Sequence, residues 1–384
     1  MSLDTFAPGG SPAAAEPVRR DPDFTMTSGR WTLRAEGGER AAPAFADPDA
    51  APELLANLRE RERATGRAHV LYGMIPFDLS EPADLRVTDR AAWRPRSVEP
   101  AALGSAGDPL PPEDSPAYRS IVADALERIE AEEVQKVVLS RTMTLDLGPE
   151  HRAEAERVIA ERLAASSRRA DVFRVRLADG ATWIGASPEI IADVSDSRFL
   201  THPLAGSLPR VPGGLDAAQA AARLAGSAKD LHEHRFVTRH IVQALEPLAR
   251  EISAPEEPEL FGTDAMWHLG TRIGGRLRPE VSALEAALAI HPTPAVGGAP
   301  TQPALRMIRE LEGSSRGFYS GLVGWTDSSG NGRWSLVLRC ASLRGDALTL
   351  YAGAGVVAGS TPSGEHAETG AKFSTMLRTL EGLL

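Results

Sequence analysis

The sequence predicts an α+β fold with antiparallel sheets, and two observations support this class. Residues 172–186 and 318–353 form runs of short strand-like segments joined by Gly-containing turns, whereas residues 215–312 carry consecutive helical stretches. Runs of strands interrupted by runs of helices, without strict alternation, are typical of α+β proteins.

The first well-defined element is a helix that begins at the Ser-Pro pair of residues 115 and 116. Tyr118, Val122 and Ile129 recur at the spacing of one apolar helix face. Residues 134–145, VQKVVLSRTMTL, are rich in β-branched side chains and predict a strand. The later expected elements are a helix at about 151–165, a strand pair at 172–177 and 181–186, strands within 190–204, helices at about 215–226, 230–250, 281–290 and 303–312, a three-stranded meander over 318–353, and a closing helix at about 365–383.

Two stretches lack periodicity. Residues 1–24 mix Pro, Gly, Ala and charge, so we expect a disordered N-terminal segment. Residues 99–116 are rich in proline and are typical of a connection between an N-terminal part and the main body.

Composition excludes several classes of function. Hydrophobic residues make up 42% of the 384 residues, and the formal net charge of −10 provides no general attraction for nucleic acid or an anionic membrane. Any bound anion must therefore be held by local cations. Cys340 is the only cysteine, which excludes an internal disulfide and a zinc site with two thiolates. Because no apolar run approaches 18 residues and no signal peptide is visible, we expect a cytoplasmic protein.

Charged residues cluster on one side of the closing helix. At about 100° per residue, Glu365, Glu368 and Lys372 fall within an arc of about 60° beside the apolar face. An ordinary helix start with a favourable i,i+4 pair explains these three residues equally well. Glu233, however, shares an apolar helix face with Val237 and needs a cation or hydrogen-bond donors. A Mg²⁺ ion held by Glu233 and the C-terminal glutamates satisfies all of these carboxylates, since it prefers oxygen ligands.

A zinc site is a weaker interpretation of the segment HEHRFVTRH. His232 and His234 are two residues apart and point to different helix faces, and the HExxH pattern is absent. We expect them to be ordinary polar helix residues.

Lys136 and Glu189 are candidates for proton transfer. Lys136 stands inside a strand among valines, where desolvation favours the neutral amine and makes it a usable base. A lysine that protects an edge strand from aggregation is the alternative. Glu189 follows a Ser-Pro corner between apolar strands; it is either a solvent-facing turn residue or an acid with a raised pKa.

Arg339 is a candidate for carboxylate recognition. It alternates with Val337 and Ser335 on a predicted strand, so its guanidinium suits two-point binding of a carboxylate or a structural ion pair. The glycines at 353 and 355 and in the segment PLAGS at 203–207 are weaker candidates for backbone contacts to an anion. The residues by themselves predict a Mg²⁺-dependent site for a small carboxylate.

The segments VQKVVLSR, ASPEII, PLAGS, KDLHEHRFV and AGAGVV through GEHAETGAK occur in the order seen in chorismate-utilising enzymes. The sequence resembles this family over about residues 110–384, and MWHLGTRI, IHPTPAVGG and FYSGLVGW also look like family segments. Among its members the resemblance is greatest to isochorismate synthases. Lys136 matches the lysine that activates water, and Ala295 stands where salicylate and anthranilate synthases tend to place threonine.

The resemblance implies a fold like anthranilate synthase component I, with two packed antiparallel sheets and outer helices, formed by residues 25–384 as one domain. It implies that chorismate binds through Mg²⁺ held by Glu233 and Glu368, with Glu365 close by. Lys136 would take a proton from the attacking water, and Glu189 would protonate the departing hydroxyl. The implied substrate contacts are Gly206, Ser207, His268, Ala295, Arg339, Gly355 and Lys372.

The implied enzyme acts on chorismate without an amidotransferase subunit, and we expect a monomer serving siderophore, menaquinone or related secondary metabolism. Salicylate synthase, which forms isochorismate and then eliminates pyruvate, is the nearest alternative. An ammonia-using synthase and a non-catalytic chorismate-binding protein are further alternatives. The presence of Lys136, Glu189 and the three glutamates of the implied metal site argues against a non-catalytic role.

Overall fold

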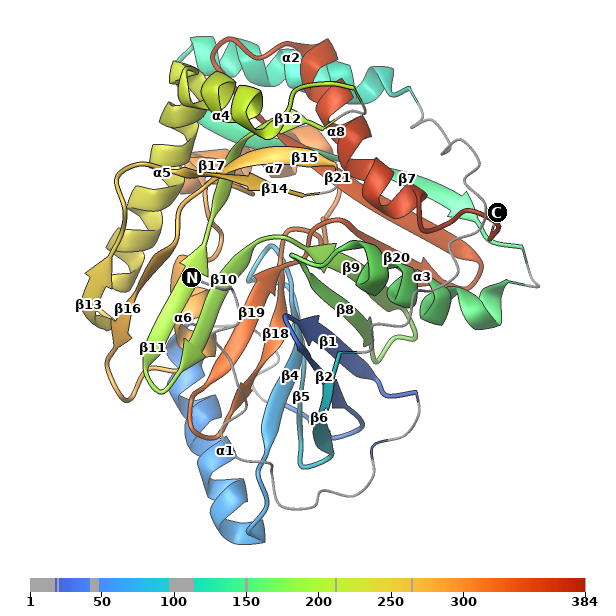
Figure 1. The fold of residues 1–384 in the computed structure, drawn as a ribbon, viewed down its shortest axis with the longest axis vertical. Helices are drawn as coiled ribbons and strands as arrows, with labels where there is room; N and C mark the ends of the chain where they lie inside the picture. The colour runs from blue at the N-terminus through green and yellow to red at the C-terminus, as the bar shows by residue number, and fades with distance from the viewer. Residues whose placement is uncertain are drawn as a thin grey trace.

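Two large antiparallel sheets organise the computed structural model, which describes residues 18, 21–41, 48–96, 114–148, 151–210, 213–263 and 265–383. Within these residues, each large sheet has nine strands (Figure 1). The first sheet runs in the order β17 (Gly298–Ala299), β7 (Lys136–Asp146), β21 (Ala347–Val357), β20 (Cys340–Arg344), β9 (Thr182–Ser187), β8 (Asp171–Arg176), β1 (Phe24–Ser28), β2 (Trp31–Ala35) and β6 (Ala91–Pro95). The second runs in the order β13 (Ala249–Ser253), β16 (Ile273–Leu277), β11 (Arg198–His202), β10 (Ile190–Ser195), β19 (Gly332–Leu336), β18 (Leu322–Asp327), β4 (Val70–Ile75), β5 (Asp84–Thr88) and β3 (Glu39–Arg40).

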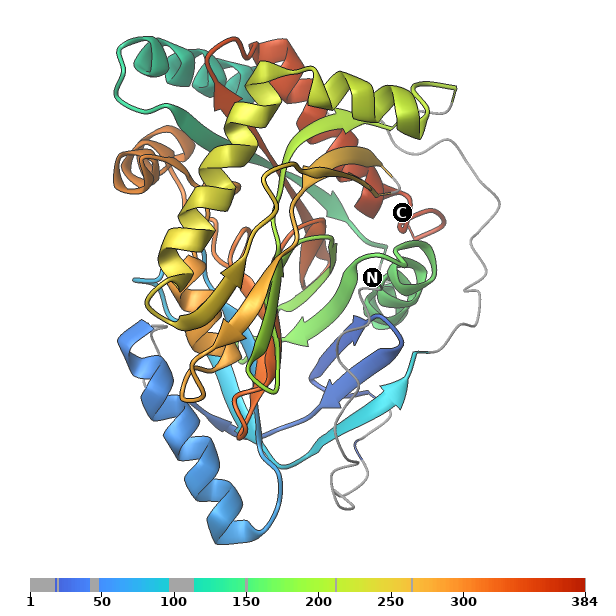
Figure 2. The same cartoon turned by 60° about the vertical axis from the view of Figure 1, so that its left-hand side comes forward.

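A small third sheet and the helices surround these two sheets. The third sheet has the order β12 (Leu204–Pro209), β15 (Met266–Gly270) and β14 (Glu259–Gly262). The helices are η1 (Pro48–Ala50), α1 (Ala51–Thr65), α2 (Pro116–Glu130), α3 (Arg152–Ser166), α4 (Ala217–Ala225), α5 (Ala228–Leu245), α6 (Ala283–Ile290), α7 (Thr301–Glu312) and α8 (Pro362–Leu377). Figure 2 shows α2, α4 and α8 gathered at one end of the molecule and α1 at the other. No helix of the described residues is long and apolar enough to span a membrane.

Side-chain caps explain where several of these helices begin. Ser115 accepts a hydrogen bond from the Tyr118 amide at the start of α2, and Pro116 follows at the first helical position. Thr361 accepts from Gly364 in the same way at the start of α8. Such caps satisfy amides that have no partner within the helix.

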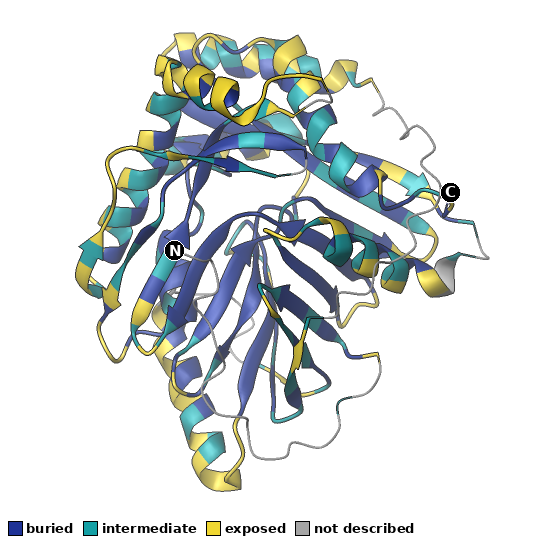
Figure 3. Cartoon of the chain, viewed as in Figure 1, coloured by how far each residue is buried: buried dark blue, intermediate teal, exposed yellow. Residues whose placement is uncertain are grey.

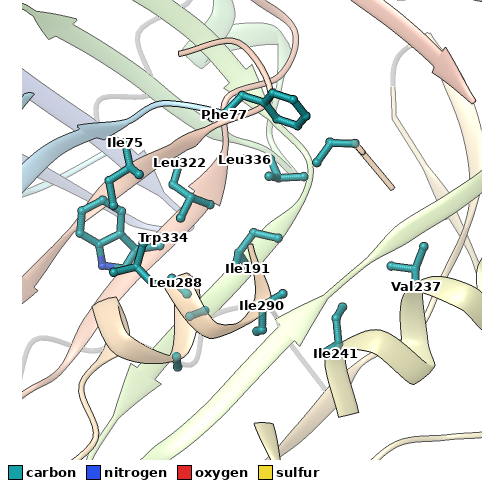
Figure 4. Close-up of a cluster of buried hydrophobic side chains, with 14 of the residues drawn as sticks. Ile75, Phe77, Ile191, Val237, Ile241, Leu288, Ile290, Leu322, Trp334 and Leu336 are labelled. Carbon is teal, nitrogen blue, oxygen red and sulfur yellow. The ribbon is translucent and has the colours of Figure 1, made fainter. Parts of the chain in front are cut away.

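The core confirms that the two large sheets pack face to face. One cluster combines residues of the first sheet, such as Val137 and Val356, with Ile191 and Leu336 of the second. Val237 and Ile241 of α5 belong to the same cluster, and Figure 4 shows both side chains projecting from this helix. The strands are largely buried, while the outer helices expose one side to solvent (Figure 3). The predicted α+β class, with antiparallel sheets and outer helices, is confirmed.

The predicted meander over residues 318–353 is wrong in one respect. The segment RWSLVLRCASL forms two strands in different sheets, because β19 belongs to the second sheet and β20 to the first. The strand conformation is interrupted between them at residues 337–339, where Arg339 adopts a left-handed φ of +48°. Apolar alternation continues through the break, so the sequence pattern alone does not reveal it.

The N-terminal residues belong to both large sheets. β1 lies between β8 and β2, and β4 pairs with β18. This arrangement fits the expectation of one domain over residues 25–384, which stays a prediction. Of the expected disordered segment, residues 1–17 and 19–20 lie outside the described residues, while Asp21 pairs with Arg174 at 2.6 Å. The proline-rich connection also lies mostly outside them.

A buried ion cluster joins the two large sheets. Arg333 of β19 donates from Nε to Asp171 of β8 at 2.8 Å and from Nη1 to Asp193 of β10. All three side chains are at most 9% exposed. Because isolated buried charges are costly, the cluster holds the sheets in one relative position only while it is complete.

We predict that Arg333→Ala lowers the free energy of unfolding by about 3–5 kcal/mol, because two carboxylates would remain buried without their cation. Urea denaturation measures the change. Arg344→Ala is the matched control, since the Arg344–Asp179 pair is more than half exposed and its loss should cost less than about 1 kcal/mol. Equal effects of the two substitutions would contradict the prediction.

Candidate active site

A pocket of about 80 Å³ lies where the first sheet, the small sheet and helices α5 and α8 meet. Ten of the twelve predicted site residues line it: Glu189, Gly206, Ser207, Glu233, His268, Ala295, Arg339, Gly355, Glu368 and Lys372. Lys136 lies directly behind this lining, and Glu365 lies one helical turn from Glu368. The tertiary structure therefore brings together residues separated by more than 200 positions in the chain.

Lys136 lies at the start of β7 and is fully buried. It pairs with Ala299 of β17 on one side and Val357 of β21 on the other, so the edge-strand interpretation is wrong. Its Nζ donates to Glu233 Oε1 at 2.7 Å. A Cβ atom at Gly355 would lie 3.0 Å from that oxygen and 3.1 Å from Lys136 Cε, so the absence of a side chain at this position makes room for the ion pair.

Glu189 occupies the corner between β9 and β10 and is 3% exposed, so the alternative of a solvent-facing turn residue is wrong. Its Oε1 is buried without a hydrogen-bond partner among the described residues. Burial raises the pKa of Glu189 to about 8, although the Leu204 amide and the nearby Lys136, Lys372 and Arg339 oppose the shift. The carboxyl group is therefore largely protonated at pH 7 and can donate a proton.

Helix α8 forms one wall of the pocket. Lys372 Nζ donates to Glu368 Oε1 at 2.7 Å and to the Gly353 carbonyl oxygen at 2.8 Å. Burial alone would raise the pKa of Glu368, but Lys372 and the Ser207 hydroxyl outweigh it and lower that pKa. Burial and the neighbouring Glu368 raise the pKa of Glu365 to about 7. The i,i+4 pair expected from the sequence is present, and it faces the pocket.

Four carboxylates gather between α5 and α8, one more than the sequence indicated. Asp230, on the first turn of α5, has a raised pKa because of its burial and, after that, the nearby Glu233 and Glu368. Among the described residues, no group of three His, Cys, Asp or Glu side chains is placed to hold a metal ion. Glu233 and Glu368 are each turned toward a lysine instead. Both lie near enough to Asp230 to raise its pKa, and carboxylate oxygens are the ligands that a hard divalent cation prefers.

Arg339 is a cation without a carboxylate partner in the described part of the chain. Its Nη2 lies 3.5 Å from His268 Nε2 and its Nη1 lies 3.4 Å from Thr375 Oγ1, and it forms no ion pair with any described residue. Burial lowers its pKa to about 10, so it remains charged at pH 7. Burial, with Arg339 and Lys372, holds the pKa of His268 well below its usual range. The guanidinium is thus available to an anionic ligand, and the neutral imidazole lies beside it.

Strand alternation was the wrong reason for predicting Arg339. The residue lies between β19 and β20 with a left-handed backbone conformation, so it belongs to neither strand and the in-and-out alternation of strand side chains does not apply to it.

The histidines of α5 have structural contacts with other described residues. His234 is buried, with Nδ1 3.2 Å from the Ala205 carbonyl oxygen and Nε2 2.7 Å from Thr271 Oγ1. This side chain fixes β12 against α5 and so positions Gly206 and Ser207 at the pocket. His232 packs against Phe236 with ring centroids 4.7 Å apart.

Several lining residues escaped the sequence analysis. Tyr319, Ser320 and Tyr351 line the pocket, and the Tyr319 and Tyr351 rings stack 5.4 Å apart. Ser320 Oγ is buried without a partner among the described residues, and its φ of +63° is unusual for a residue other than glycine. The segment FYSGLVGW was the available signal, but aromatic residues before a strand are ordinary core residues in most proteins.

The pocket places the protonated carboxyl group of Glu189, the side chain of Lys136 and the guanidinium of Arg339 around one space. This combination of an acid, a candidate base and an anion-binding group is typical of an enzyme active site. Comparison with known proteins defines its kind: the chain belongs to the family of chorismate binding enzymes, whose model matches residues 98–381.

Isochorismate synthase DhbC of Bacillus subtilis is 38% identical over 338 residues, which cover 84% of this chain and 83% of that protein. The solved structure of DhbC from Bacillus anthracis matches with a TM-score of 0.82 and 33% identity, over 96% of this chain and 98% of that one. Anthranilate synthase component I from Streptococcus pneumoniae shares the fold, with a TM-score of 0.71 at 19% identity and 95% of both chains covered.

We predict that Glu189→Gln is stabilised relative to the wild type as the pH rises from 5 to 8. The raised pKa means that the folded wild type keeps a proton that the unfolded chain has lost, so its stability falls with pH in this interval. The amide cannot ionise. The difference in free energy of unfolding between variant and wild type should therefore grow by up to about 3 kcal/mol. Urea denaturation at each pH measures it, and a constant difference would show that Glu189 is ionised throughout.

Proposed function

We propose that this chain is an isochorismate synthase, which converts chorismate into isochorismate. The observation that carries the proposal is that the protonated carboxyl group of Glu189 and the buried side chain of Lys136 lie at the same pocket. This isomerisation needs an acid and a base that act on the same small anion. The similarity to DhbC of Bacillus subtilis, over most of both chains, supports the same activity.

In the proposed reaction, a water oxygen bonds to ring C2 while the bond between C4 and its hydroxyl breaks and the ring double bonds shift. Lys136 accepts a proton from the attacking water, and Glu189 gives a proton to the departing hydroxyl. One water is consumed and one is released, so the atoms balance. Lys136 Nζ donates to Glu233 in the structure, so it must turn from that carboxylate toward the water before it can act as the base.

Substrate binding is assigned to the cations and small residues of the pocket. Chorismate carries two carboxylates, and Arg339 and Lys372 are the cations that line the pocket. Gly206 and Gly355 let the backbone approach the ligand closely, while Ser207 and His268 supply polar contacts. Ala295 completes the lining as a small residue beside the ring.

Mg²⁺ is the proposed cofactor, with Glu233 and Glu368 as ligands and Glu365 close by. When bound, the ion supplies positive charge that holds and polarises a substrate carboxylate. Asp230 belongs to the same carboxylate group and adds to its negative potential.

The wider setting is also proposed. We infer a monomer that acts in the cytoplasm without an amidotransferase subunit, and a product used for a siderophore or related secondary metabolite. A gene deletion that leaves growth under iron limitation unchanged would contradict the siderophore role and favour menaquinone synthesis.

The central test is incubation of the protein with chorismate and Mg²⁺, followed by chromatography of the products. We expect isochorismate. Because Lys136 provides the base, Lys136→Ala should lose about 10²–10⁴-fold in kcat, whereas Arg344→Ala, which removes an exposed cation outside the pocket lining, should lose far less. Salicylate with pyruvate would instead identify a salicylate synthase. The absence of any turnover would favour a binding role.

The metal proposal is tested by thermal unfolding with and without Mg²⁺, which does not depend on activity. We predict that Mg²⁺ raises the Tm of the wild type, because a ligand that binds only the folded state stabilises it. In Glu233→Gln and Glu368→Gln the shift should shrink, with Mg²⁺ affinity reduced by roughly 10–100-fold or more. Glu310→Gln, an exposed carboxylate on α7, is the control. A full Mg²⁺ shift in both pocket variants would remove these residues as ligands.

A further inference from the structure

A second, larger cavity adjoins the active-site pocket. Its volume is about 500 Å³, and it lies between the end of α3, the end of β12 and the β14–β15 hairpin. Pro188 and Arg339 line both this cavity and the active-site pocket, so the two share a wall. The larger cavity is within the range of about 300–1,000 Å³ that is typical of ligand sites, whereas the inner pocket is below it.

The outer cavity is lined by arginines. Arg168 and Arg169 follow the end of α3, are exposed, and form no ion pair with a described residue. Arg210 lies over the Trp267 ring at 4.7 Å and donates to the Thr263 carbonyl oxygen. It too forms no ion pair with a described carboxylate. No aspartate or glutamate is among the described residues that line the cavity.

A donor and a further cation extend this basic surface. Trp267 Nε1 is buried without a partner among the described residues, although its ring lines the cavity. Arg378 is exposed and lies close enough to Arg339 to contribute to lowering its pKa. The positive potential therefore continues from the outer cavity to the guanidinium at the shared wall.

This local charge opposes the charge of the whole chain, which is −10. A protein with that net charge repels an anion at long range, and a cleft lined by one sign of charge focuses the field and raises the rate of association. Another large cavity, of about 580 Å³, carries Asp78 and Glu81 beside Arg309 and Arg316 and has no such excess. A dianion is thus drawn to the arginine-lined cavity.

We propose that this cavity, here called the arginine vestibule, is the entry chamber of the active site. It captures a small dicarboxylate with Arg168, Arg169 and Arg210 and passes it to Arg339. The inference rests on the proposed function, because chorismate is the dicarboxylate concerned. It adds the route and the residues that govern capture, none of which takes part in the chemical step.

The test compares the double variant Arg168→Gln/Arg169→Gln with Arg309→Gln/Arg306→Gln, which removes the same charge from α7 on another face. Stopped-flow tryptophan fluorescence gives the association rate constant of chorismate at several ionic strengths, and steady-state assays give kcat and kcat/KM. For the vestibule variant we expect association to slow roughly 3- to 10-fold at low salt and to depend less on salt. The loss should fall on kcat/KM and leave kcat nearly unchanged.

The outcomes separate this inference from the proposed function. If the wild type turns over chorismate but both double variants associate equally fast, the vestibule is wrong and the function stands. If the wild type binds chorismate without turnover, the function fails, and the association rates still decide the vestibule. Failure of the wild type to bind chorismate overturns both. A vestibule variant that loses kcat as strongly as kcat/KM places these arginines in the chemical step and also overturns the inference.

Discussion

The ion pair between Lys136 and Glu233 is the constraint on which the site depends. Both groups come from elements whose other side chains form the core, and the lysine has no exposed surface. A buried charge without a partner is strongly destabilising, so β7 and α5 must meet at this point. A Cβ atom at Gly355 of β21 would lie only 3.0 Å from Glu233 Oε1 and 3.1 Å from Lys136 Cε, so glycine at this position leaves room for the pair. The Lys372–Glu368 pair of α8 then faces the same space, and the two pairs together define a polar pocket inside an otherwise apolar fold.

Burial also separates the roles of the titratable groups. Glu189 forms no ion pair with a described residue, so desolvation outweighs the nearby cations and keeps it protonated at neutral pH. Glu368 is less deeply buried, and its contacts with Lys372 and Ser207 lower its pKa and keep it ionised. Arg339 has no carboxylate partner among the residues that the structure describes, which leaves the pocket with a cation available to an anionic ligand. One pocket thus holds a proton donor in Glu189, an anionic group in Glu368 and an anion-binding group in Arg339. The charge state of each is set by its own burial and neighbours.

The site exists because the chain crosses between the large sheets beside it. The hairpin β18–β19 lies in the second sheet and the pair β20–β21 in the first. At this crossing Arg339 has a left-handed backbone conformation, and its side chain lines the pocket. Beside this crossing, Glu189 lies at the β9–β10 corner, which also crosses from the first sheet to the second. Such crossings leave the sheets open locally, and the polar groups of the site occupy that opening, while Arg333 and its two aspartates hold the sheets together further along.

The sequence by itself determined the class of fold, most of the helices and strands, and the residues able to transfer protons or bind an anion. It could do so because periodicity, caps and ordered motifs are local properties of the chain. It also showed that Glu233 on an apolar face needed a partner. Only the tertiary structure decided that this partner is Lys136, that β7 is an interior strand, and that Arg339 lies in a break between sheets. Asp230, Tyr319 and Ser320 gave no local signal because ordinary helix and core positions carry the same residue types. Which charges are buried, paired or free depends on contacts between residues far apart in the chain, and those contacts exist only after the sheets have packed.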